Sequence, residues 1–234
     1  MHPTDFPQEF LDRLVQRRGR VHAFEAVESQ KTALVVVDMQ NCFCAAGAAG
    51  EVPLAKELVP NINLLARETR EAGGLVVWVQ SAISNRSEWP IFLDTLIKPH
   101  LADHYVLDLT PGGEGHKLWP ALEPEPNDLF VSKNRFSAFL PSACSLPQIL
   151  RERCIDTVMI TGTLTNVCSE SSARDAAMSD FKTIMISDGN ATRSDEDHLA
   201  TLRTFIAVFG DVRTSEEMVA LLRAGSAKML SAAE

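Results

Sequence analysis

The chain has 234 residues, of which 45% are hydrophobic, and a formal net charge of −9 at pH 7. This length and apolar content favour one large domain with a sizeable core. The negative charge and the lack of a Lys- or Arg-rich run exclude nucleic acid and anionic membranes as expected partners. No apolar run approaches the ~20 residues that span a bilayer, and the first residues lack an apolar signal core.

Residues 1–30 are polar and predict an extension that precedes a single domain at 31–234. Apolar residues recur in it at helical spacing, which indicates a short amphipathic helix carrying Phe10, Leu11, Leu14 and Val15. Such a helix could pack on its own domain or on a partner subunit, and the pattern does not choose between them.

Strand and helix patterns alternate through the rest of the chain. Continuous apolar runs, typical of strands buried on both faces, occupy 32–37, 75–79, 128–132, 157–161, 182–187 and a short stretch at Val212. Helical periodicity covers 54–72, 146–153, 166–180, 195–209 and 215–224. The alternation predicts an α/β fold, a three-layer α/β/α sandwich with a mostly parallel central sheet.

Residues 81–126 interrupt this alternation. The segment is rich in proline and contains Gly112-Gly113, so we treat it as irregular. It is too long for a simple connection, which indicates either a functional lid or an oligomer contact.

The cysteine count is odd, with no pattern of a disulfide framework, and this predicts a reducing, cytoplasmic location. Cys42 and Cys44 are separated by one residue and have no second Cys or His pair nearby, so they make a poor zinc site. The other cysteines are Cys144, Cys154 and Cys168.

Three reactive side chains follow predicted strands. Asp38 and Lys133 come directly after their strands, and Cys168 opens the helix after the strand at 157–161. Because the carboxyl ends of parallel strands meet at one edge of a sheet, we expect an acid, a base and a thiol to form a nucleophilic site. The positive end of the helix dipole predicts a lowered pKa for Cys168 and partial thiolate character.

Each of these residues also has a purely structural interpretation. Asp38 could cap a turn, Lys133 could be a surface lysine, and Cys168 could be a buried core thiol. The combination of the three favours the catalytic interpretation.

Three sequence blocks, at 35–41, 132–139 and 161–168, resemble in order and spacing the signature blocks of the isochorismatase-like cysteine hydrolase superfamily. That superfamily includes nicotinamidases, N-carbamoylsarcosine amidohydrolases, ureidoacrylate amidohydrolases and biuret hydrolases. The resemblance covers roughly residues 30–225.

The resemblance implies a catalytic triad of Asp38, Lys133 and Cys168. In it, Cys168 attacks a carbonyl carbon, Asp38 accepts the thiol proton, and Lys133 favours the thiolate and orients Asp38. It further implies an oxyanion hole built from the backbone N–H groups of Leu164 and Cys168, and a cis peptide between Thr163 and Leu164.

The thiol and the lack of metal ligands narrow the reaction class. Isochorismatases proper usually lack this cysteine, so Cys168 favours amide, imide or ureido C–N cleavage. Nicotinamidases bind a metal through an Asp-x-His pair, which residues 80–86 lack. His100 and His104 are four apart but stand beside Pro99 without a third ligand, so we expect no metal and no cofactor.

Polar and aromatic residues near the triad are the candidate substrate contacts. A small cavity with amide and guanidinium donors suits a ureido or carboxylate substrate. For Arg135 a structural salt bridge is an equal alternative, and core packing is the default for Trp78 and Trp89. The candidates are Asn41, Phe43, Gln80, Asn134, Arg135, Phe136 and Asn166.

The sequence therefore predicts a metal-independent cysteine amidohydrolase acting on a small amide or N-carbamoyl compound. The alternatives are a maleamate or cyclic-imide hydrolase, another hydrolase of the same type, and a catalytically silent binding or scaffold protein of the same fold. The resemblance also implies a homo-oligomer, a dimer or a tetramer.

Overall fold

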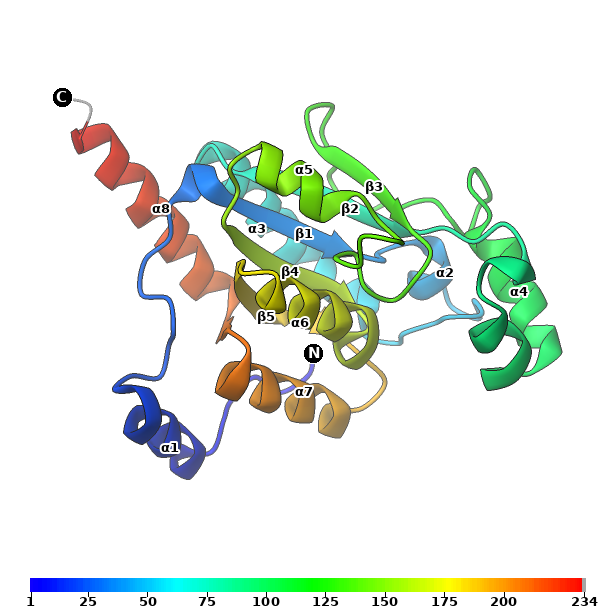
Figure 1. Cartoon of the computed structure of the whole chain (residues 1–234), viewed down its shortest axis with the longest axis horizontal. Coiled ribbons are helices and arrows are strands. Elements are labelled where there is room, and N and C mark those ends of the chain that lie inside the picture. Colours follow the sequence, from blue (N-terminus) through cyan, green and yellow to red (C-terminus); the bar gives the residue numbers. More distant parts are fainter. Residues whose placement is uncertain (233–234) are drawn as a thin grey trace.

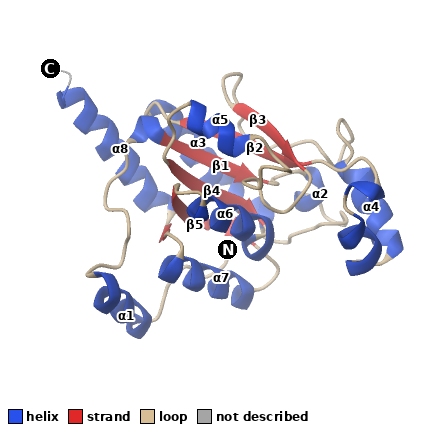
Figure 2. Cartoon of the chain, viewed as in Figure 1, coloured by secondary structure: helices blue, strands red, loops and turns tan. Residues whose placement is uncertain are grey.

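The computed structural model describes the backbone of residues 1–232 and the side chains of residues 1–227. Its centre is a six-stranded sheet in the order β3-β2-β1-β4-β5-β6, with every neighbouring pair parallel (Figure 2). The strands are β1 (Thr32–Val37), β2 (Leu75–Ser81), β3 (Leu129–Lys133), β4 (Thr157–Thr163), β5 (Lys182–Ala191) and β6 (Asp211–Arg213).

Helices cover both faces of the sheet, which confirms the predicted three-layer sandwich (Figure 1). Alternate β1 side chains explain this, because Leu34 and Val36 belong to one apolar cluster and Val35 and Val37 to the other. The first face is covered by α2 (Asn41–Cys44), α3 (Val59–Glu71) and α8 (Ser215–Ala232), and the second by α5 (Leu146–Glu152), α6 (Glu170–Met178) and α7 (Asp195–Val208).

The strands and helices predicted outside 81–126 are all present, with ends that differ by a few residues except in α8, which continues eight residues past its predicted end at 224. Two helical segments are more complex than predicted. The segment at 54–72 divides into a 3₁₀ turn, Ala55–Leu58, followed by α3, and a π-helical turn, Thr165–Ser169, precedes α6.

The treatment of 81–126 as irregular is wrong in part. The segment contains a π-helical turn at Ile91–Leu96 and an α-helix, α4 (Pro99–Leu109). Pro90 and Pro99 stand at the start of these turns, where a missing backbone N–H costs nothing, so the prolines begin helices here rather than breaking them.

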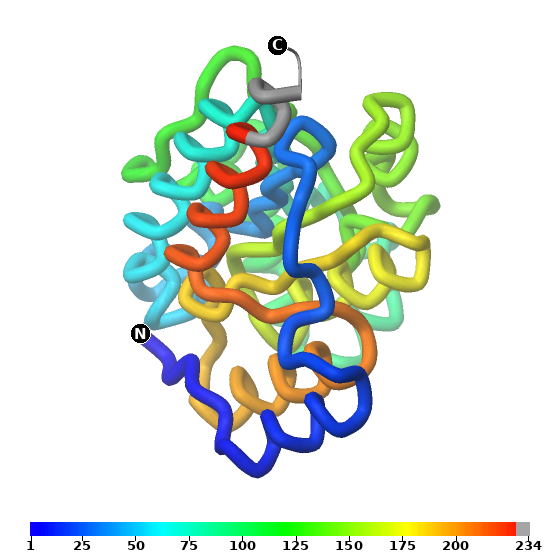
Figure 3. Tube along the Cα trace, turned by 90° about the vertical axis from the view of Figure 1, so that its left-hand side faces the viewer, coloured from blue at the N-terminus to red at the C-terminus, as the bar shows by residue number. Residues whose placement is uncertain are grey.

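The predicted N-terminal helix is α1 (Gln8–Arg18), and it packs on its own domain. Phe10 and Leu14 are buried, and Arg18 donates a hydrogen bond to the carbonyl of Ile206 in α7. From α1 the chain runs along the side of the molecule before it enters β1 (Figure 3).

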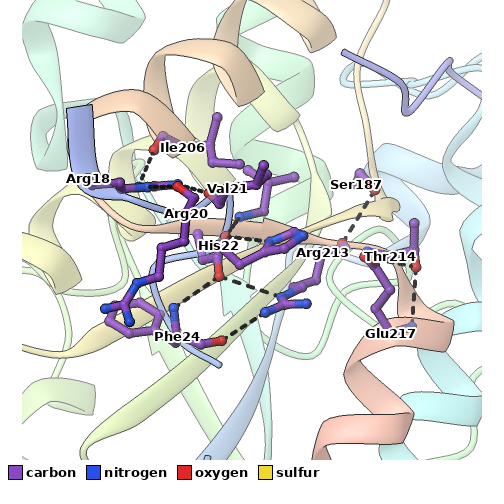
Figure 4. A network of polar contacts seen from close by, with 12 residues as sticks. Arg18, Arg20, Val21, His22, Phe24, Ser187, Ile206, Arg213, Thr214 and Glu217 are labelled. Atoms are coloured by element: carbon purple, nitrogen blue, oxygen red, sulfur yellow. Dashed lines mark hydrogen bonds and ion pairs between the residues drawn. The ribbon is translucent and has the colours of Figure 1, made fainter. Parts of the chain in front are cut away.

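A polar network fixes the segment after α1 to the amino end of β6 (Figure 4). The buried carboxylate of Asp211 lies 3.0 Å from Nδ1 of His22 and accepts the backbone N–H of Phe24 at 3.2 Å. Arg213 in turn donates to the carbonyl of Phe24. Within residues 1–232 no helix has both the length and the apolar character needed to cross a membrane.

Gly162 allows β1 and β4 to approach closely next to the predicted site. Its φ is +115°, and a Cβ at this position would lie 2.0 Å from the carbonyl oxygen of Val37. Only glycine fits here, because both the left-handed backbone and the close contact exclude a side chain.

Candidate active site

Asp38 and Lys133 form a buried ion pair at the carboxyl ends of β1 and β3. Lys133 Nζ lies 2.7 Å from Asp38 Oδ2, and neither side chain is exposed to solvent. Asp38 adopts a φ of 54°, so the chain turns sharply where β1 ends. The parallel register brings together two residues that are 95 positions apart in the sequence.

Ser81 completes this pair, and the sequence analysis did not single it out. The Lys133 ammonium donates to Ser81 Oγ at 2.7 Å, and Ser81 Oγ donates to Asp38 Oδ1 at 2.9 Å. Both carboxylate oxygens of Asp38 are thus hydrogen-bonded, which holds the group in one orientation. The position of Ser81 at the end of β2 is a signal that could have identified it.

Cys168 lies beside this pair in the π-helical turn Thr165–Ser169, and its thiol interacts with the side chains of Asp38 and Lys133. The peptide bond between Thr163 and Leu164 is cis, as the resemblance implied. The structure therefore brings the three expected catalytic side chains together at one edge of the sheet.

The predicted lowering of the Cys168 pKa is wrong. Burial raises the pKa of this thiol, and the positive charge of Lys133 lowers it by less while Asp38 opposes ionisation further. The helix terminus was visible in the sequence, but the burial that outweighs it is a property of the folded chain. The resting site therefore contains a neutral thiol beside a carboxylate.

A cavity of about 230 Å³ opens beside Cys168 and Lys133. Among the expected substrate contacts, Phe43, Asn134, Arg135 and Phe136 line it. The remaining lining residues, most of them apolar, are Ser81, Ile83, Trp89, Phe92, Ile97, Tyr105, Leu109, Leu164, Val167 and Arg193.

Three expected contacts do not line this cavity. Asn41 donates to the backbone and side chain of Glu114, and Gln80 donates to the carbonyl of His116. Asn166 accepts a hydrogen bond from Thr192 Oγ1 at 2.6 Å. The hydrogen bonds of these three amides connect loops around the site, so their side chains do not face the cavity.

Residues from the 81–126 segment form an aromatic wall of the cavity. The ring of Trp89 lies 4.7 Å from that of Phe92 and 4.6 Å from that of Phe136, measured between centroids. Trp78 is a core residue as expected, but Trp89 is not, because Pro90 and the following turn place it over the cavity. The 81–126 segment therefore supplies one wall of the cavity.

Two arginines line the cavity in different ways. Arg135 donates to the carbonyls of Asn134 and Glu88 and lies 5.0 Å from the centroid of the Trp89 ring, so it braces the wall rather than forming a salt bridge. Arg193, on the loop between β5 and α7, is exposed at the rim and interacts with Tyr105. No local sequence signal distinguishes Arg193.

His100 and His104 lie on α4 and are both exposed. Among the described residues, no group of three or more His, Cys, Asp or Glu side chains is arranged to hold a metal ion. Metal independence remains a prediction.

Together, the parallel sheet and the Asp38, Lys133 and Cys168 side chains at its carboxyl edge define an α/β protein with a candidate active site beside a small cavity. Residues 32–217 match the isochorismatase domain family. The chain belongs to the isochorismatase family and is a hydrolase of that family.

Individual relatives agree with this assignment. The ureidoacrylate amidohydrolase RutB of Variovorax paradoxus (strain S110) is 32% identical over 180 residues, which cover 70% of this chain and 69% of RutB. A cysteine hydrolase from Pseudomonas syringae pv. phaseolicola 1448A superposes with a TM-score of 0.79 at 28% identity, over 86% of this chain and 97% of that chain. The N-carbamoylsarcosine amidase of Thermoplasma acidophilum superposes with a TM-score of 0.64 at 26% identity, over 79% of this chain and 96% of that chain.

Proposed function

We propose that this protein is a cysteine-dependent amidohydrolase that cleaves a C–N bond of a small amide or N-carbamoyl compound through an acyl-enzyme on Cys168. The observation that carries the proposal is the contact of a buried thiol with the Asp38–Lys133 ion pair at the base of a small cavity. Similarity to an amidohydrolase and an amidase supports the C–N bond as the target.

The proposed reaction begins from the neutral thiol. Asp38 accepts the proton of Cys168 while the sulfur attacks the carbonyl carbon, and the positive charge of Lys133 stabilises the developing anionic site. In this proposal the backbone N–H groups of Leu164 and Cys168 stabilise the oxyanion. Asp38 then returns the proton to the leaving nitrogen, and water hydrolyses the thioester to release the acid and regenerate the thiol.

The cavity favours a compact substrate with a planar or apolar body. Its volume is about 230 Å³ and its walls carry the rings of Phe43, Trp89, Phe92 and Phe136. Arg193 at the rim adds a positive charge that suits a carboxylate at the far end of the substrate from the scissile bond. We therefore propose a ureido acid or an amide of a dicarboxylic acid as the substrate.

The proposal is tested by measuring ammonia release from a panel containing ureidoacrylate, N-carbamoyl amino acids, maleamate, a cyclic imide, biuret and nicotinamide. We expect turnover of an anionic ureido or amide compound, and its loss in Cys168→Ala. The matched control is Cys144→Ala, which removes another buried thiol from the same apolar cluster. Full activity of Cys168→Ala on the best substrate would disprove the mechanism.

Self-association and location are also proposals. Ile91, Leu96 and Leu107 project exposed apolar side chains from the segment that forms the cavity wall, which is consistent with burial against a second copy. Sedimentation analysis of the wild type and of Leu107→Lys tests this, with a dimer or tetramer expected only for the wild type. All five cysteines are free, which is consistent with the proposed cytoplasmic location.

A further inference from the structure

His2 is buried against the site although it lies outside the matched family domain. Its side chain is 3% exposed and sits against the loop that joins β5 to α7. Nδ1 of the imidazole lies 2.6 Å from Asp195 Oδ1, and Nε2 accepts the backbone N–H of Thr192 at 3.0 Å. With Nδ1 as the donor to Asp195 and Nε2 as the acceptor from Thr192, one ring makes both contacts at once.

These two contacts lie on either side of Arg193. Thr192 precedes it and Asp195 follows two residues later, so one imidazole holds both ends of the short loop that presents Arg193 to the cavity. Arg193 is itself exposed at the rim, and its position therefore depends on how well this loop is held.

The imidazole also reaches the turn that carries the nucleophile, by two routes. Through Thr192, whose Oγ1 donates to Asn166 Oδ1 at 2.6 Å, it connects to the residue two positions before Cys168. Through His198, on which its ring stacks with centroids 4.6 Å apart, it connects to Thr165, whose Oγ1 lies 2.9 Å from His198 Nδ1.

His198 is suited to this relay because it stays neutral. Burial, followed by the neighbouring charge of His2, lowers the pKa of His198 to about 4. Near neutral pH its ring can therefore stack on His2 and hold Thr165 without a buried charge to compensate.

We propose that His2 is a positioning residue for the hydrolytic site, holding both the Arg193 loop and the nucleophile turn in their working geometry. The N-terminal segment is then part of the active-site support rather than an appendage. This inference rests on the proposed function, in which Cys168 is the nucleophile and Arg193 contacts the substrate.

The N-terminal extension contains its own control. His22 also pairs with a carboxylate of the domain, Asp211, but does so at the amino end of β6 (Figure 4). The reacting groups lie at the carboxyl ends of the strands, so loss of the His22 contact weakens the docking of the extension without reaching the site.

The experiment compares His2→Ala, His2→Phe and His22→Ala in a protein that carries no N-terminal tag. Steady-state kinetics on the best substrate, the rate of Cys168 alkylation by iodoacetamide and the melting temperature are measured for each. We expect kcat/KM to fall about tenfold or more in His2→Ala, because small displacements of reacting groups are costly, and alkylation of Cys168 to change with it. In His22→Ala we expect both to stay at the wild-type level.

His2→Phe separates the hydrogen bonds that His2 makes to the Arg193 loop from its stack on His198. This variant remains informative if His2→Ala does not fold. Phenylalanine keeps the stack on His198 but loses both hydrogen bonds to the Arg193 loop, so KM should rise more than kcat falls. Kinetics and alkylation unchanged in His2→Phe, or altered equally in His22→Ala, would overturn the inference. If either result is seen while Cys168→Ala is inactive in the same assay, the role of His2 is disproved and the proposed function still stands.

Discussion

Lys133 and Asp38 are held 2.7 Å apart with both side chains shielded from solvent. Burial by itself lowers the pKa of Lys133, but the negative charge of Asp38 and the contact with Cys168 raise it above its ordinary value. The lysine therefore stays charged at neutral pH. Its positive charge stabilises the buried carboxylate of Asp38 next to the thiol.

Removing this lysine should abolish activity and weaken the fold. In Lys133→Met the Asp38 carboxylate remains buried without its partner, which costs about 3–5 kcal/mol of unfolding free energy. We expect kcat/KM to fall by about three orders of magnitude or more, because proton transfer and charge stabilisation are lost together. Chemical denaturation and steady-state kinetics measure the two effects.

A double variant separates the two effects. Asp38→Asn combined with Lys133→Met removes both charges and should recover much of the stability without recovering activity. The control is Lys182→Met, which breaks an exposed ion pair with Asp156 and should change neither the stability nor the activity by much. Activity retained in Lys133→Met would rule out the proposed role of the ion pair.

Arg193 should set the preference for anionic substrates. In Arg193→Met we expect KM for a carboxylate-bearing substrate to rise about tenfold while kcat changes little, because the lost contact binds the substrate body in the ground state and the transition state alike. A neutral analogue of the same substrate is the control and should be turned over as well as by the wild type. Equal losses on both substrates would contradict the prediction.

Alkaline pH should destabilise the protein through its buried thiols. Burial raises the pKa of Cys42, Cys44, Cys144 and Cys168, and that of Cys44 to about 12. Above the ordinary thiol pKa of about 8.5 the unfolded chain releases these protons and the folded chain keeps them. Stability is therefore complete below that pH and falls above it, by up to about 1.4 kcal/mol per pH unit for each thiol.

Melting temperatures measured from about pH 7 to about pH 10 test whether stability falls at alkaline pH. Cys44→Ala removes one buried thiol and should make the alkaline decline in melting temperature less steep. Cys154→Ala changes an exposed residue and should leave the decline as it is. A melting temperature that stays constant above about pH 8.5 would show that the thiols ionise in the folded protein.

Gly162→Ala should prevent the normal packing of β1 against β4. The added Cβ would lie 2.0 Å from the Val37 carbonyl oxygen, and the φ of +115° is itself unfavourable for alanine. We expect a loss of about 4 kcal/mol or more, seen as insoluble or partly unfolded protein. Gly112→Ala is the control that tests the unfavourable backbone conformation alone, because Gly112 has a φ of +85° and a Cβ there would meet nothing within 4 Å. It should lower the unfolding free energy by only about 1 kcal/mol.

The strand–helix alternation and the location of the three candidate catalytic residues were predictable because both depend on local patterns. A short, Val-rich apolar run such as that of β1 indicates a strand buried on both faces, and the residue that follows such a strand lies at the carboxyl edge of a parallel sheet. Asp38, Lys133 and Cys168 could therefore be placed together before the tertiary structure was known.

The cavity wall was not predictable in the same way. The segment at 81–126 has mixed signals, because a proline marks either the end or the first turn of a helix depending on what packs against it. Trp89 and Tyr105 become cavity residues only when α4 and the turn before it fold over the sheet edge.

The sequence alone determined the α/β architecture, the three candidate catalytic residues and the turn that carries Cys168, since strand burial, strand ends and helix starts depend on a few neighbouring residues. The tertiary structure decided the direction of the Cys168 pKa shift, the place of Arg193 at the cavity and the contact of His2 with the Arg193 loop. These depend on burial and on partners as much as 193 positions apart, which only the folded chain brings together.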